Sequence, residues 1–140
     1  MPISELIATL AAGLFAGAAL YVNLVEHPAR MTLGPAAALA EFAPSYKRGT
    51  NMQASLAVAG SVAGVLAWLL GAPRGWLVGA CLLGAVVPFT LIVIFPTNRA
   101  LLAGPGERDA SRLLARWNRL HAVRTALSLA ALVVFLSMRQ

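Results

Sequence analysis

The sequence predicts an all-α membrane protein, a bundle of four transmembrane helices, and two observations carry this prediction. First, 59% of the 140 residues are hydrophobic and only 11% are charged, against about 25% charged in an ordinary globular domain. Second, the apolar residues gather in four continuous runs, whereas a disordered chain would be polar and a transmembrane strand would be shorter and alternating. The length allows one domain, residues 1–140.

Each apolar run has a length that suits a bilayer. We expect transmembrane spans at about residues 5–26, 52–72, 75–96 and 119–138. Because an α-helix rises about 1.5 Å per residue, about 20 residues cross a hydrocarbon core of about 30 Å. The first run lacks a basic segment before it and a small-residue cleavage site after it. It is therefore expected to be a membrane span and not a cleaved signal peptide.

Prolines divide the remaining helical segments. In the first connection, residues 35–43 are expected to form a short amphipathic helix that Pro44 ends. In the second connection, one helix is expected to begin at about residue 108 and continue to 138, with an amphipathic first part that projects beyond the bilayer. Pro88 lies inside the third span, where it is expected to kink the helix.

Basic residues are distributed unequally between the two sides of the membrane. The side with the longer connections carries Arg30, Lys47, Arg48, Arg99, Arg108, Arg112, Arg116, Arg119 and Arg124, and the other carries Arg74 and Arg139. Because positive charge stays cytoplasmic, both termini are expected outside an inner or plasma membrane. The net charge of +6 is then explained by topology, with anionic membrane lipid as the partner and no nucleic acid.

Polar side chains gather where the four spans meet this cytoplasmic boundary. They are Asn23, Glu26, His27, Tyr46, Arg48, Asn51, Asn98, Trp117, Asn118, His121 and Arg124. Tryptophan, tyrosine and arginine also serve as ordinary interfacial anchors, but carboxylates and imidazoles at this depth are costly and usually mark a site. We therefore expect a site that faces the cytoplasm. For Glu26, a structural ion pair with Arg48 or Arg124 is the alternative.

Four short motifs, one at the cytoplasmic end of each span, carry a resemblance that covers nearly the whole chain. They are Asn23-Leu-Val-Glu26-His27-Pro28-Ala29, Tyr46-Lys-Arg48-Gly-Thr-Asn51, Pro96-Thr-Asn98-Arg-Ala-Leu and Trp117-Asn118-Arg-Leu-His121-Ala-Val-Arg124. In this layout the chain resembles the anthrone-oxygenase-like family of small four-helix membrane proteins. The resemblance implies oxidation of an anthrone by O₂ to an anthraquinone, without a dedicated organic cofactor.

The cluster suits the chemistry of a flat, apolar anthrone-like or hydroquinone-like substrate. Imidazole transfers protons near neutral pH, so His121 is expected to be the base, oriented by Asn118 or Glu26, with His27 as the second imidazole candidate. The other expected roles are anion stabilisation by Arg48 and Arg124, ring stacking by Tyr46 and Trp117, and substrate contacts by Asn23, Asn51, Asn98 and Asn118.

Two alternatives belong to other functional classes. In the first, His27, His121 and Glu26 bind a transition metal, or the two histidines are the axial ligands of a haem. In the second, the chain is a non-catalytic membrane scaffold or transporter subunit, although no inverted repeat supports transport. The sequence is compatible with an oligomer.

Overall fold

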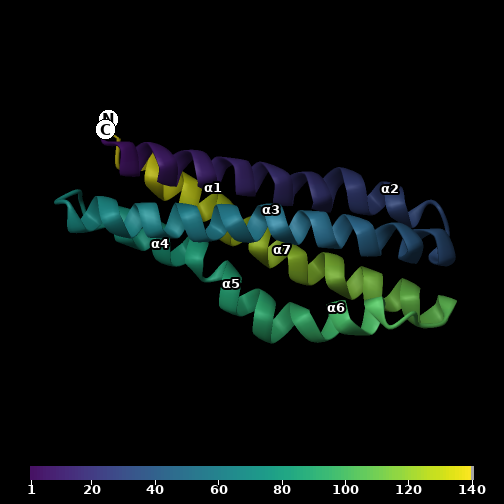
Figure 1. Cartoon of the computed structure of the whole chain (residues 1–140). Helices are drawn as coiled ribbons and strands as arrows, with labels where there is room; N and C mark the ends of the chain where they lie inside the picture. The colour runs from purple at the N-terminus through teal and green to yellow at the C-terminus, as the bar shows by residue number, and fades with distance from the viewer. Residues whose placement is uncertain (140) are drawn as a thin grey trace.

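Four long helical segments make up residues 1–139, the part of the chain that the computed structural model describes. They are Ile3–Met31, Pro35–Leu69, Gly75–Leu102 and Glu107–Ser137, and each is long and apolar enough to cross a membrane. Residues 1–139 contain no strand. The predicted all-α class with four spans is therefore confirmed. The two termini lie together at one end of the bundle (Figure 1).

The first and third segments are subdivided, whereas the second and fourth are continuous. The first consists of α1 (Ile3–Tyr21), the π-helical turn η1 (Val22–Glu26) and α2 (His27–Met31). The third consists of α4 (Gly75–Gly84), α5 (Val86–Phe89), the π-helical turn η2 (Thr90–Ile94) and α6 (Phe95–Leu102). The second segment is α3 (Pro35–Leu69) and the fourth is α7 (Glu107–Ser137), close to the expected helix over residues 108–138.

The prediction that Pro44 ends a short helix is wrong, because α3 continues through it. Proline removes one backbone donor and clashes with the preceding turn, so another interaction must hold the helix together there. Glu41 and Ser45 flank Pro44, and both side chains bond to Arg30 of α2. This cross-link fastens α3 on both sides of the proline.

The third segment, in which Pro88 is expected to cause a kink, is interrupted near that proline. Regular α-helix stops at Gly84, and α5 begins after Ala85, so the interruption precedes Pro88 by less than one turn. Proline at position 88 has no N–H for the Gly84 carbonyl four residues earlier. Beyond the break, α5 and α6 diverge from α3 (Figure 1), and α6 packs against α7.

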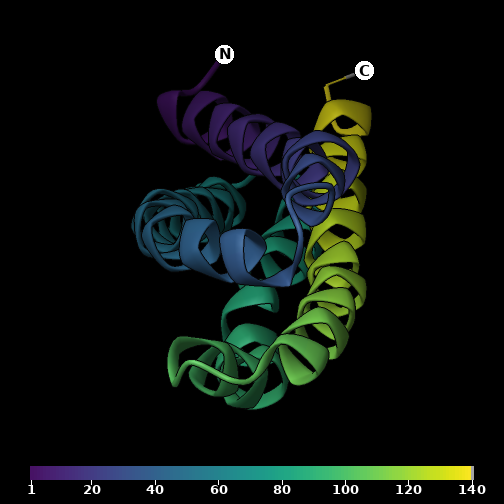
Figure 2. The ribbon, with the colours of Figure 1, turned by 90° about the vertical axis from the view of Figure 1, so that its right-hand side faces the viewer.

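Two apolar cores lie along the bundle, which Figure 2 shows nearly end-on. The core nearer the termini contains many alanines from α1, α3 and α4, together with Trp76 and Phe135, whose rings stack at 5.1 Å. The second core contains Phe42, Leu114 and Trp117 together with Ile94 of η2 and Leu101 of α6. Small side chains let helices approach closely, and this packing replaces the hydrophobic driving force that membrane helices lack among themselves.

Candidate functional site

A cavity of about 370 Å³ lies between the first, second and fourth segments, in the half of the bundle away from the termini (Figure 1). Its volume falls in the usual range for small-molecule sites, about 300–1,000 Å³. Its lining residues are Ala18, Tyr21, Val22, Glu26, Arg30, Phe42, Ser45, Tyr46, Arg48, Gly49, Thr50, Met52, Gln53, Trp117, His121 and Arg124.

The cavity collects some of the predicted site residues and leaves others outside. Those in its lining are Glu26, Tyr46, Arg48, Trp117, His121 and Arg124. Those outside it are Asn23, His27, Asn51, Asn98 and Asn118. The exclusion of Asn51 has a simple cause: it is an exposed residue of α3, on another face of the helix from Tyr46 and Gln53.

His121 is the most unusual side chain of the cavity. It is 2% exposed, and neither Nδ1 nor Nε2 has a hydrogen-bond partner within residues 1–139. Buried polar side-chain atoms are nearly always hydrogen-bonded, because a missing partner costs about 1–3 kcal/mol. His121 thus lines the cavity as an unpartnered imidazole, but both of its nitrogens are themselves buried, so a ligand reaches them only when neighbouring side chains move.

The expected orientation of His121 by Asn118 or Glu26 is wrong, because both residues bond elsewhere. Asn118 accepts a hydrogen bond at its Oδ1 from Asn23 Nδ2, at 2.7 Å. Asn23 Oδ1 in turn accepts one from the Thr125 hydroxyl. This chain of bonds joins η1 to α7, so Asn23 and Asn118 hold the two helices together.

The indole ring of Trp117 connects the two histidines. It stacks on His121 with centroids 4.8 Å apart and on His27 at 5.8 Å, and Phe42 meets it edge-on at 5.3 Å. Its Nε1 donates to Asn98 Oδ1 at 2.8 Å. Asn98 Nδ2 also donates to the Tyr46 hydroxyl, at 3.2 Å. Asn98 is thus a positioning residue for two aromatic rings of the cavity.

Arg124 reaches the cavity with part of its guanidinium unused. Its Nη2 donates to Gln53 Oε1 at 2.8 Å, while Nε has no partner within residues 1–139. The guanidinium lies over the Phe15 ring, 5.3 Å from the centroid, in a cation–π contact that stabilises a desolvated charge. Arg124 therefore combines a fixed position with a free donor, which suits an anion that forms during a reaction.

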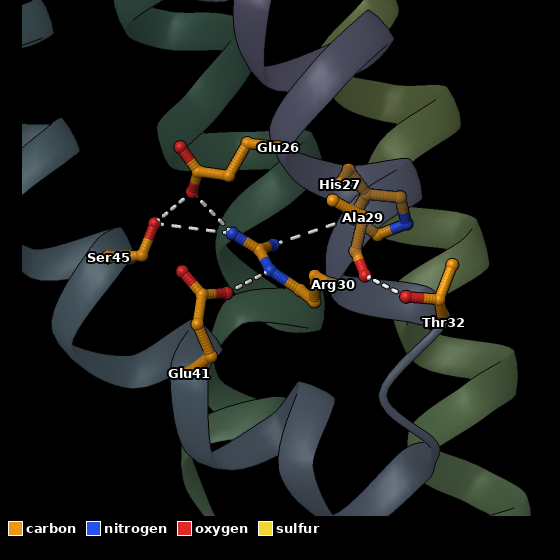
Figure 3. A network of polar contacts seen from close by, with 7 residues as sticks. All are labelled: Glu26, His27, Ala29, Arg30, Thr32, Glu41 and Ser45. Carbon is orange, nitrogen blue, oxygen red and sulfur yellow. Dashed lines mark hydrogen bonds and ion pairs between the residues drawn. The ribbon is translucent and has the colours of Figure 1, made fainter.

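Arg30 is the centre of an ion-pair network on one side of the cavity (Figure 3). Its Nη2 donates to Glu26 Oε1 at 2.6 Å and to Ser45 Oγ at 3.2 Å, and its Nε donates to Glu41. Ser45 also donates to Glu26. The expected ion pair of Glu26 with Arg48 or Arg124 is therefore wrong, because Arg30 takes that place.

The same network distinguishes His27 from His121. The Arg30 Nη1 lies 3.5 Å from His27 Nδ1, and a guanidinium can only donate. His27 Nδ1 is thus an acceptor for Arg30. His27 is buried and stacks on Trp117, but it lies outside the cavity lining.

Comparison with known proteins assigns the family. The sequence model of the family described as anthrone oxygenase matches residues 42–134. Anthrone oxygenase tpcL of Aspergillus fumigatus is 30% identical over 136 residues, covering 88% of this chain and 84% of the relative. The chain belongs to the anthrone oxygenase family. No solved structure matches it.

Membership of the anthrone oxygenase family confirms the resemblance that the four motifs predicted, and it indicates an oxygenase. The part that the family shares here, residues 42–134, includes Trp117, His121 and Arg124, but it begins after the Glu26–Arg30 pair. The free imidazole and the partly free guanidinium of the cavity therefore belong to the family region.

The metal-binding alternative gains no support from the geometry. Within residues 1–139, no group of three or more His, Cys, Asp or Glu side chains is arranged to hold a metal ion. Glu26 is drawn to Arg30, and both imidazoles stack on Trp117. Aromatic packing and the ion-pair network thus account for the three residues of that set.

Ten of the sixteen lining residues were not among the predicted site residues, and three of them, Arg30, Phe42 and Gln53, take part in the contacts described above. The signal for Arg30 was its spacing of four residues from Glu26, which brings both side chains to one helix face. Gln53 follows Tyr46 by seven residues, two turns of the same face of α3. The sequence contained no such signal for Phe42, because an apolar residue in a helix is ordinarily interpreted as part of the hydrophobic core.

Proposed function

We propose that this protein is an oxygenase that oxidises a flat, apolar, anthrone-like substrate in the 370 Å³ cavity, with His121 as the base. The observation that carries the proposal is the imidazole of His121, which belongs to a lining residue of the cavity and whose two buried nitrogens have no partner. The similarity to the anthrone oxygenase of Aspergillus fumigatus suggests the substrate class. The half-buried ring of Tyr46 offers aromatic surface to such a ring system, and the buried rings of Phe42 and Trp117 stand behind it in the lining.

The first step is the loss of a proton from the methylene carbon between the two aromatic rings of the substrate. His121 accepts this proton, and the electron pair spreads onto the carbonyl oxygen. The free Nε donor of Arg124 stabilises that oxyanion. A charge that develops in a buried site interacts more strongly with a fixed dipole or cation than it would in water.

The second step consumes one O₂. The substrate anion transfers one electron to O₂, and the resulting radical and superoxide couple to form a C–O bond. The imidazolium of His121 returns its proton to the peroxide. His121 then removes the second methylene proton while the O–O bond breaks, and the departing hydroxide leaves as water. In sum, CH₂ and O₂ become C=O and H₂O, so the substrate supplies all the electrons.

We also propose that the cavity opens toward the cytoplasmic boundary of an inner or plasma membrane, with both termini outside. The support is the excess of basic residues in the two longer connections. Membrane lipid would then deliver the apolar substrate sideways. Reporters active only outside the cytoplasm should signal when fused to the C-terminus and stay silent in the 103–106 connection. The opposite pattern would refute this orientation.

Purified protein in lipid nanodiscs provides the test of activity. With an anthrone as substrate, quinone absorbance should rise while one O₂ is consumed per quinone. Replacing His121 with alanine should slow this reaction about 10²–10⁴-fold, as loss of a general base does. His27→Phe is the matched control, because it preserves the stack on Trp117 and leaves the cavity lining intact.

Both variants are compared per folded molecule, with thermal unfolding in detergent as the check on folding. A folded His121→Ala variant with full activity would refute the assignment of the base. Wild-type protein that consumes no O₂ with an anthrone would refute the proposed substrate class.

A further inference from the structure

A second cavity of about 110 Å³ lies beside the first. The two share Thr50, Gln53 and Arg124 in their walls. The second continues away from this shared wall among Phe15 of α1, α3 and the broken third segment. Its remaining lining residues are Phe15, Ala54, Ala57, Val86, Val87, Thr90 and Leu91.

Most of the wall of the second cavity is apolar, and its charged residue, Arg124, stands in the part of the wall that the two cavities share. The Thr90 hydroxyl donates to the Val86 carbonyl at 2.7 Å, and Gln53 Oε1 accepts from Arg124 Nη2 at 2.8 Å. These groups are therefore engaged with the protein. Small cavities with apolar walls stay dry and bind apolar molecules such as xenon.

The second cavity lies next to the interruption of the third segment, and residues that follow the interruption line it. At Ala85 the helix is interrupted, and α5 with η2 turns away from α3 (Figure 1). Val86, Val87 and Leu91 of this displaced stretch form one wall. Leu91 is 60% exposed, so the wall reaches the lipid-facing surface of the bundle, where an apolar gas is concentrated by the hydrocarbon.

We propose that the second cavity is a dioxygen chamber that supplies the large cavity through their shared wall. This inference rests on the proposed oxygenase function. A space of 110 Å³ is less than a third of the substrate cavity, 370 Å³, so it is too small for a polycyclic substrate and suits a diatomic gas. Dioxygen thus reaches the substrate anion beside Arg124 without passing through the aqueous boundary.

Filling the chamber tests the proposal. Ala57 is 1% exposed and lines the chamber, so Ala57→Leu places three further carbons inside it. Ala54→Leu narrows the chamber from an exposed position, and it keeps the test available should the first variant fail to fold. Val58→Leu is the matched control on the same helix, because Val58 is 54% exposed to lipid and lies outside both linings.

Two measurements on the full-length protein are expected to agree. The first measurement is crystallography under xenon pressure, with xenon as the apolar probe. Xenon should occupy the chamber in the wild-type protein and in the Val58→Leu control. It should be absent from the chamber in the two filled variants. The KM for O₂ should rise about tenfold in the filled variants, as when an apolar pocket loses its fit to a small ligand. The KM for the organic substrate should stay unchanged.

The possible results distinguish a failure of the dioxygen-chamber proposal from a failure of the proposed oxygenase function. An active oxygenase without xenon in the chamber, or with an unchanged KM for O₂ in the filled variants, would overturn the chamber. Xenon bound in the chamber of a protein that consumes no O₂ would instead refute the oxygenase function.

Discussion

The two halves of the bundle contrast in how their buried groups are satisfied. Near the termini, alanines and the stacked Trp76 and Phe135 form an apolar core. In the other half, Arg30 and Asn98 hold their neighbours through hydrogen bonds and ion pairs. Within residues 1–139, the buried side-chain nitrogens and oxygens without a partner all belong to His121 and Arg124.

This contrast teaches that polarity inside a membrane bundle is not by itself the mark of a site. Arg30 is 3% exposed, yet its contacts serve to fasten α2 to α3. Arg30, His121 and Arg124 all line the cavity, but the donors of Arg30 are taken by Glu26, Ser45 and Glu41, whereas His121 and one nitrogen of Arg124 have no partner. Four substitutions test the distinction between buried residues that hold the helices together and buried residues that serve the site. Their expected effects on stability decrease in the order Trp76, Arg30, Gly79 and Cys81.

Replacing Trp76 with alanine should give the largest loss of stability. Trp76 is 1% exposed and stacks on Phe135, so the truncation leaves a cavity that costs about 3–5 kcal/mol. Activity per folded molecule should not change, because Trp76 lies in the half without the substrate cavity. Unfolding in detergent and O₂ uptake measure the two quantities. A loss of activity without a loss of stability would contradict the view that the half of the bundle near the termini serves only to stabilise the fold.

Arg30→Gln should destabilise the protein by a smaller amount. Breaking a buried ion pair costs about 3–5 kcal/mol, but Glu26 and Glu41 have side chains that are 27% and 38% exposed. Solvent therefore reduces the expected loss to about 2–3 kcal/mol. The control is Arg112→Gln, since Arg112 pairs with Asp109 on the surface, at 77% and 61% exposure.

The Arg30 variant also tests the role of the network. Activity should fall, since Arg30 lines the cavity and holds Glu26, a second lining residue, in place. Equal stability of the Arg30 and Arg112 variants in detergent would contradict the view that the network fastens α2 to α3.

Gly79→Ala should cost about 1–3 kcal/mol through overpacking. A Cβ atom at this position would lie 2.4 Å from Cε1 of Phe135, and that ring is fully buried against Trp76. The matched control is Gly17→Ala, where the added Cβ meets nothing within 4 Å. Both variants should keep their activity per folded molecule. A Gly79→Ala protein as stable as the control would show that this core is looser than its contacts imply.

Cys81→Ala should have the smallest effect, within about 0.5 kcal/mol, as is usual for exposed positions. Cys81 is exposed on α4 and lies in neither cavity lining. Activity should equal that of the wild type, measured by the same O₂ uptake. A marked loss would place a functional surface on the lipid-facing side of α4.

The candidate site was predictable in part, and the errors share a cause. Glu26, Trp117, His121 and Arg124 were expected at one membrane boundary, and they do line one cavity. Hydropathy gives the limits of each span, and the limits give the approximate depth of each residue in the membrane. It does not determine the rotation of each helix about its own axis, which decides whether a side chain meets the cavity, a neighbouring helix or lipid.

The sequence by itself determined the all-α class, the four spans, the break near Pro88 and the family, because these follow from composition, local chain chemistry and short motifs. Tertiary structure alone decided the contacts between helices. It paired Arg30 with Glu26 and Glu41, placed Asn98 between Trp117 and Tyr46, and left His121 without a partner. These outcomes depend on how helices distant in sequence pack side by side, and no local pattern specifies that packing.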